Sequence, residues 1–207
     1  MSRLLRFLII GLVAGFPVYA LLVADLVVVP DLERRLAEAA AQGGPGEATV
    51  DISGFPVAAR ALSTGSVKKV TFQWSEAKLG PLRGTVHLEL RGIQLRRGGL
   101  LSGEVLFEGV ESGGLEVLIP YEQIERVIAL EIDPNAGDPK VAVSPSESVP
   151  LTFSASPTSL LLAPEGFDPV TVVLGGRPLP CAPKVESQTT GLNLSCPFRG
   201  VPGFLRP

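Results

Sequence analysis

Apolar and polar residues alternate along much of the first half of the chain, and this alternation limits the possible folds more than any other feature. Val70, Phe72 and Trp74 are separated by single polar residues, and residues 86–90 repeat the pattern. Successive side chains of a β-strand point to opposite faces, so a period of two predicts strands with one buried and one exposed face. Glycine pairs and prolines separate such segments, which favours antiparallel pairing.

Further strands are expected between turn signals such as Gly113-Gly114. We expect them at residues 48–53, 104–110, 115–119, 140–143, 150–155, 159–163, 170–174 and 188–195. Helices are expected at residues 56–64 and 120–129, where apolar residues recur at helical spacing behind a proline. The loop signal at residues 133–139 is interpreted as a bend within one domain. The pattern predicts an α+β fold with mainly antiparallel pairing.

An apolar segment near the N-terminus predicts targeting to a membrane. Residues 7–24 are 18 consecutive uncharged positions. As a helix they nearly cross a hydrocarbon core of about 30 Å. Arg3 and Arg6 precede the segment and Asp25 follows it. By the positive-inside rule, the N-terminus stays in the cytoplasm and the chain after residue 25 is exported.

Two fates of this segment are open. Residues 18–20 offer the small side chains that signal peptidase reads, which favours a cleaved signal peptide, whereas the apolar continuation through Ala24 favours a retained signal anchor. We divide the chain into this segment, residues 1–25, and a single exported domain, residues 26–207. The domain is either held at the cell membrane by a single transmembrane helix or secreted into a periplasm-like space. A short amphipathic helix over residues 30–42 is expected to follow the segment.

Composition and motifs argue against nucleic-acid binding and catalysis. The net charge of -3 and the pI near 5.3 provide no broad basic field for a phosphate backbone. His87 is the single histidine and lies among polar residues of a predicted strand, without a nucleophile or an orienting partner. No phosphate-binding loop or dinucleotide motif occurs. We therefore expect no catalytic residue, no metal site and no cofactor.

The two cysteines of the chain, Cys181 and Cys196, are 15 positions apart. An exported domain meets an oxidising compartment, where such a pair is expected to close. The spacing differs from that of redox-active pairs, and two thiols without histidines do not complete a zinc site. We therefore expect a structural disulfide.

Three motifs in the first two thirds of the chain are similar to those of one known family. They are the Ser-Gly-Phe-Pro sequence at residues 53–56 with the alternating residues 67–72, the strand that ends in Arg-Gly-Ile at residues 88–93, and the Ile-Pro-Tyr step at residues 117–124. Over residues 26–130 the chain resembles the LmeA-like proteins, a family of exported phospholipid-binding proteins of actinobacteria.

The resemblance implies a non-catalytic protein that binds phospholipid acyl chains at a membrane and supports lipid transfer or lipid and lipoglycan assembly in the cell envelope. Its implied fold is a long, curved antiparallel sheet wrapped around short helices, similar to tubular lipid-binding domains. Protein partners are not predicted. Basic pairs such as Lys68-Lys69 could touch anionic headgroups, although solvated ends of strands are the simpler interpretation.

One apolar face is predicted to hold the acyl chains. The strand residues share a face through their period of two, and helical spacing turns Tyr121, Ile124 and Ile128 towards it. The predicted lining residues are Phe55, Leu62, Val70, Phe72, Trp74, Val86, Leu88, Leu90, Ile119, Tyr121, Ile124 and Ile128. Periodicity does not distinguish a hollow face from a filled one. A structural or protein-interaction domain of the envelope without bound lipid is therefore the alternative, and an enzyme is the third hypothesis.

Overall fold

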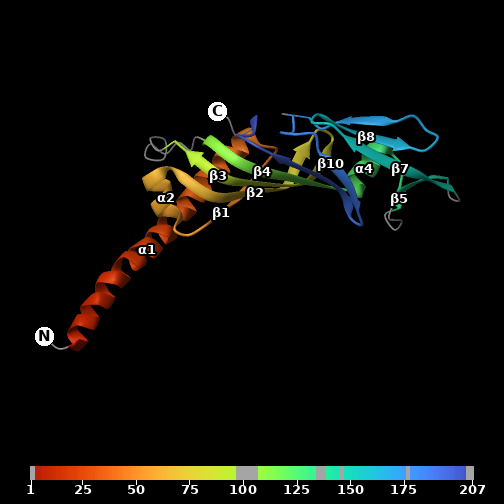
Figure 1. Cartoon of the computed structure of the whole chain (residues 1–207). Helices are drawn as coiled ribbons and strands as arrows, with labels where there is room; N and C mark the ends of the chain where they lie inside the picture. Colours follow the sequence, from red (N-terminus) through yellow and green to blue (C-terminus); the bar gives the residue numbers. More distant parts are fainter. Residues whose placement is uncertain (1–2, 97–106, 134–138, 145–146, 176–177, 204–207) are drawn as a thin grey trace.

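A computed structural model describes residues 3–96, 107–133, 139–144, 147–175 and 178–203. In these residues, two open antiparallel sheets follow one another along the long axis of the molecule (Figure 1). A long helix, α1 (Arg3–Gly43), projects from one end, and its N-terminal half lies outside the body formed by the sheets. The expected α+β fold with mainly antiparallel pairing is confirmed.

The larger sheet has six strands in the order β1-β2-β3-β4-β11-β10. The strands are β1 (Thr49–Ser53), β2 (Ser66–Leu79), β3 (Leu82–Leu95), β4 (Phe107–Pro120), β10 (Lys184–Gln188) and β11 (Gly191–Phe198). Buried residues alternate with exposed ones along most of β2 and β3, as the period of two predicts. The chain's last strands therefore complete a sheet that its first strands begin.

The smaller sheet has the order β5-β6-β7-β8-β9. Its strands are β5 (Ile132–Asp133), β6 (Lys140–Ser144), β7 (Glu147–Ala155), β8 (Ser159–Pro164) and β9 (Val170–Val173). It meets the larger sheet at Gly80, in the β2–β3 turn, where φ is +66°. A Cβ there would lie 2.2 Å from the carbonyl oxygen of Val173, so only glycine lets the two backbones approach this closely. One hydrophobic core runs through both sheets.

The two strands expected at residues 104–110 and 115–119 are one strand, β4, across the part that the structure describes. Residues 104–106 lie outside the described residues. Gly113-Gly114 is not a turn, because both residues lie within β4. The Phe198 ring of β11 lies over Gly113. A Cβ on Gly113 would be 2.3 Å from the Phe198 ring, so this glycine serves packing within a strand.

The expected strand at residues 188–195 was also wrong in its bounds. β10 ends at Gln188 and β11 begins at Gly191, so this range includes a hairpin turn. The remaining expected strands are confirmed to within a few residues, and β5 is an additional short strand. Helices α2 (Val57–Thr64) and α4 (Tyr121–Ile128) lie where helices were expected.

The short amphipathic helix expected at residues 30–42 is the last part of α1 rather than a separate element. Pro30 lies inside the helix, where it removes one backbone hydrogen bond and its ring crowds the preceding turn, yet α1 continues through it. Within the part of the chain whose side chains are described, no helix has an apolar stretch long enough to span a membrane.

Candidate functional site

The predicted lining residues of the strands lie together in the core of the larger sheet. Nine of the twelve are exposed by 6% or less, and Ile128 packs against the same core at its edge. The nine are Val70, Phe72, Trp74, Val86, Leu88, Leu90, Ile119, Tyr121 and Ile124. The strand pattern and the spacing on α4 therefore bring them to one apolar face, which we call the inner face.

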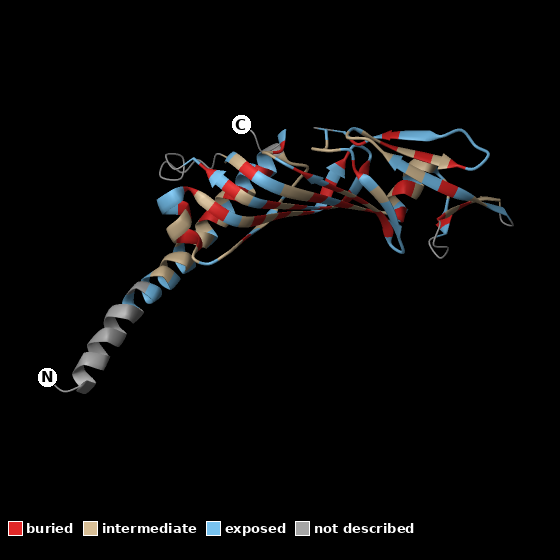
Figure 2. Cartoon of the chain, in the orientation of Figure 1, coloured by how far each residue is buried: buried red, intermediate tan, exposed pale blue. Residues whose placement is uncertain are grey.

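Three helices contribute the side chains that cover this core, and α2 (Val57–Thr64) contributes Val57 and Ala61. The C-terminal part of α1 buries Leu32, Leu36 and Ala40, and α4 buries Tyr121 and Ile124 (Figure 2). The loop after α1 adds a close contact, because a Cβ on Gly44 would lie 2.9 Å from Trp74 Nε1. The Trp74 ring in turn stacks on Phe72, with 5.8 Å between ring centroids.

The inner face is filled rather than hollow in this structure. Phe72, Leu88, Leu90 and Ile124 have 0% of their surface accessible. A side chain without accessible surface touches no space wide enough for a water molecule. An acyl chain, which is wider than water, could reach these residues only if a covering helix moved away.

Phe55 and Leu62 do not share the enclosed face. Phe55 precedes α2 and is 52% exposed, and Leu62 on α2 is 56% exposed. The helix turns Val57, Ala58 and Ala61 inward instead, so the apolar spacing at residues 56–64 is satisfied without Leu62. These two side chains therefore lie outside the enclosed face, and their contact with lipid stays a prediction.

α4 is fastened to the larger sheet at its first residue. The Tyr121 hydroxyl forms a hydrogen bond with the Ser187 side chain on β10. Burial raises the pKa of Tyr121, and the hydrogen bond to Ser187 opposes that rise. Beyond Tyr121, Ile124 is the other fully buried side chain of α4. The helix thus covers the inner face through Tyr121 and Ile124, with Val127 and Ile128 packed against the core, and Glu125 Oε1 accepts a further hydrogen bond from the Ile132 N–H at 2.8 Å.

The opposite face of the larger sheet is polar. Glu89 on β3 accepts hydrogen bonds from Lys69 Nζ and Arg91 Nε, each at 2.6 Å. The hydrogen bond from Lys69, followed by that from Arg91, lowers the pKa of Glu89. His87, on the same strand, is exposed, as expected for the polar face. These groups form a solvated charge network rather than a reaction centre.

Two surface hollows lie away from the inner face. One, of about 410 Å³, is lined by Glu47, Ala48, Thr49, Gln73, Ser75 and Glu76. The other, of about 240 Å³, is lined by Glu89, Arg91, Ser112, Gly113 and Gly114. Both are rich in polar groups and neither includes a predicted lining residue, so they offer acyl chains little apolar surface.

Two acidic residues of α1 have structural roles that the sequence pattern did not indicate. The Asp25 carboxylate accepts hydrogen bonds from the backbone N–H groups of Val57, at 3.0 Å, and Ala58, at 2.7 Å. Glu33 Oε1 accepts one from the Ile52 N–H at 2.9 Å. Both partners are 19 or more positions away in the sequence, so local spacing carried no signal for them.

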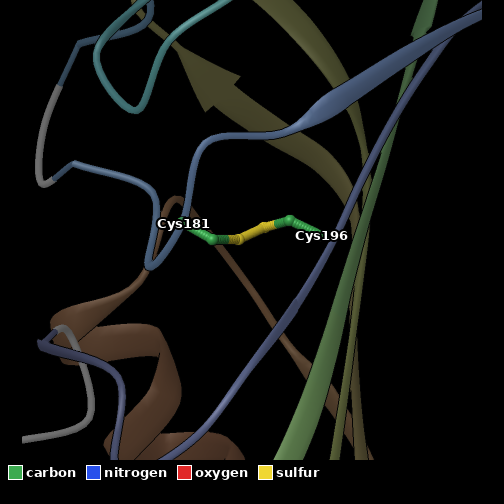
Figure 3. The surroundings of a disulfide bond; sticks show 2 residues. All are labelled: Cys181 and Cys196. Carbon is green, nitrogen blue, oxygen red and sulfur yellow. A yellow bond between two sulfur atoms is a disulfide. The ribbon is translucent and has the colours of Figure 1, made fainter.

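The disulfide between Cys181 and Cys196 is confirmed (Figure 3). It joins the loop that precedes β10 to the buried end of β11, with 6.1 Å between the Cα atoms. It therefore holds the loop before β10 against β11 of the larger sheet.

The described residues contain no group of three or more His, Cys, Asp or Glu side chains that could hold a metal ion. The arrangement defines a small β-rich protein whose most extensive feature is an apolar sheet face covered by helices. The chain belongs to the LmeA-like phospholipid-binding family, whose sequence model matches residues 20–207. The resemblance over residues 26–130 is thus confirmed, and the match extends through the disulfide-bonded C-terminal part. No similarity to a curated protein or to a solved structure was found.

Proposed function

We propose that this protein is an exported, membrane-associated phospholipid-binding protein of the cell envelope that acts without catalysis. The match to a phospholipid-binding family over residues 20–207 carries the proposal. The covered apolar face supports it, because an extended set of aliphatic and aromatic side chains is the surface that acyl chains require. Each methylene transferred from water contributes about 0.8 kcal/mol, so the acyl chains would dominate the affinity.

A retained membrane anchor is part of the proposal. Along α1, the side chains of Phe16, Tyr19, Leu26 and Val27 are 66 to 75% exposed. Apolar surface left in water costs about 25 cal/mol per Å², and a bilayer would remove that cost. Together with Arg3 and Arg6 before the apolar segment, this favours a helix that holds the domain on the extracytoplasmic side.

Lipid entry requires one of the covering helices to move, and we place this movement at α4. This helix has eight residues and two buried side chains. The C-terminal part of α1 is held more firmly, by three buried side chains and by the hydrogen bonds of Asp25 and Glu33. Acyl chains would then enter beside Ile119, which lies two residues before α4, and extend along β3 towards Leu88.

The test is the amount of phospholipid that remains with the purified full-length protein after exchange into lipid-free detergent, measured by mass spectrometry. We expect a fixed ratio of phospholipid to protein in the unmodified chain. Leu88→Trp should abolish it, because the indole occupies the space that the acyl chain needs. Phe167→Trp, at a position 54% exposed between β8 and β9, is the matched control and should retain the lipid.

In the lipid-free protein, Leu88→Trp should lower the free energy of unfolding by about 1–3 kcal/mol through overpacking. If this variant does not fold, Ile128→Trp at the half-buried edge provides the same test with less strain. Equal lipid content in all variants would contradict binding at the inner face.

The filled inner face also favours a second candidate, a structural or protein-interaction domain without lipid. The edge strand β9 offers a surface for it, because Val173 is 63% and Val170 37% exposed. An unmodified protein that carries no phospholipid in the same measurement would support this candidate.

A further inference from the structure

We infer that Phe55, Leu62, Arg60 and Lys68 form a second lipid contact, which docks the domain on an anionic bilayer surface beside the point where α1 leaves the membrane. We call these four residues the α2 patch. The inference rests on the membrane anchoring proposed above, and it names the surface that the domain touches.

The apolar part of the α2 patch has no role in the fold. α2 packs inward through Val57, Ala58 and Ala61. Phe55 and Leu62 remain 52% and 56% exposed, and both are large side chains. Elsewhere in the described chain, exposed large apolar side chains lie on α1 between Phe16 and Val27 or near β9. Because α2 contacts α1, the α2 patch lies beside the helix that carries most of these side chains.

The position of the patch along α1 is fixed by Asp25. Its carboxylate accepts the backbone hydrogen bonds of Val57 and Ala58, two and three residues after Phe55. α2 consequently lies beside the middle of α1, next to the residue that ends the apolar segment 7–24 (Figure 1). A helix that spans the bilayer through this segment would bring Asp25, and with it the α2 patch, to the lipid headgroups.

The charges around the patch match an anionic surface. The stem of Lys68 lies against Gly54, because a Cβ on this glycine would be 2.9 Å from Lys68 Cβ. Arg60 and Lys68 form no ion pair within the described residues, whereas Lys69 binds Glu89. Of the two adjacent lysines, Lys69 is therefore paired within the fold, whereas the charge of Lys68 is available to a lipid headgroup.

Within the described residues, neither Arg60 nor Lys68 forms an ion pair with the nearby carboxylates of Asp25 and Glu33. The carboxylates of Asp25 and Glu33 accept backbone hydrogen bonds. Large apolar side chains flanked by uncompensated basic groups are the composition of segments that lie in the headgroup region of a membrane. This favours a lipid surface over a protein partner.

The test uses the full-length protein in vesicles of equal parts phosphatidylcholine and phosphatidylglycerol. Phe55→Trp and Leu62→Trp place a tryptophan in the patch, and Phe167→Trp is the control of similar exposure in the smaller sheet. Phospholipids brominated on their acyl chains quench tryptophan by contact. The buried Trp74 supplies a constant background, measured in the unmodified protein, and its near-ultraviolet signal confirms that each variant is folded.

We expect strong quenching and a blue shift at positions 55 and 62 and neither at position 167. Changing both Arg60 and Lys68 to Gln should reduce the ratio of docked to undocked protein by about fivefold per charge. For the unmodified protein, the ratio of docked to undocked protein should fall by the same factor in vesicles of phosphatidylcholine alone.

Flotation of the vesicles in a density gradient shows whether the protein is bound to them. If bound protein is quenched at positions 55 and 62 no more strongly than at position 167, the inference is overturned, but the proposed membrane anchor is not. Protein that does not float with the vesicles at all would instead contradict the membrane association proposed above, and the inference with it.

Discussion

Asp25 illustrates how one side chain connects distant parts of this protein. It follows the apolar segment directly, so in the sequence it indicates membrane topology. In the structure its two carboxylate oxygens also bind the first N–H groups of α2, which have no partner within their own helix. Its position in the sequence thus marks the end of the apolar segment, and its contacts attach α2 to α1.

Replacing Asp25 with Ala should lower the free energy of unfolding by about 1 kcal/mol, within the range of 0.5–2 kcal/mol for a lost helix cap. Asp25→Asn keeps one acceptor oxygen and should cost less. Urea unfolding of the full-length protein in detergent measures both. An alanine variant as stable as the unmodified protein would show that α2 is held by packing alone.

A second residue-scale prediction concerns acid. The pKa of Glu89 lies below its ordinary value of 4.5 because Lys69 and Arg91 donate hydrogen bonds to the carboxylate. A carboxyl whose folded-state pKa is lowered stabilises the fold above its unfolded-state pKa, and this stabilisation disappears as the pH falls through the folded-state value. Glu89→Gln should therefore be less stable than the unmodified chain at neutral pH, and the difference should shrink below pH about 4. Urea midpoints across this range measure it, and a constant difference would contradict the assignment.

At the scale of elements, strands with strict alternation were predictable, and so were the two short helices behind prolines. Gly113-Gly114 was interpreted as a turn, whereas Gly113 makes room within β4 for the Phe198 ring. A glycine pair in the sequence does not distinguish these two roles. α1 continues through Pro30 and buries Leu32 and Leu36 in the core, a contact with distant residues that residues 30–42 alone do not reveal. The twelve lining residues were largely brought together as expected, but whether their face is open depends on the volumes of side chains that meet only in three dimensions.

The disulfide should determine how the C-terminal elements open. A closed loop of about 15 residues corresponds to about 3 kcal/mol on the chain-entropy model. Reduction, or Cys181→Ser with Cys196→Ser, should lower the free energy of unfolding by that order and accelerate hydrogen exchange in β10 and β11 before β2 and β3. Exchange measured by mass spectrometry distinguishes the strands. Equal protection of all four strands after reduction would contradict this order.

For the whole molecule, the proposed anchor predicts an orientation. A tag placed after Pro207 should be digested by protease added to cells stripped of their wall, because Arg3 and Arg6 keep only the N-terminus inside. A tag between Met1 and the apolar segment should be protected in the same cells and serves as the control. Digestion of the N-terminal tag and protection of the C-terminal one would reverse the topology.

The unbroken course of α1 gives the proposed anchor a mechanical consequence. One helix of 41 residues includes both the apolar segment and the side chains Leu32 and Leu36 in the protein core, with no loop between them. A transmembrane helix responds to a thinner bilayer by tilting. Since no loop separates the two parts, and Pro30 is the one position between them where the helix lacks a backbone hydrogen bond, the sheets would turn with the helix. The angle at which the domain stands over the membrane would then follow the thickness of the bilayer beneath it.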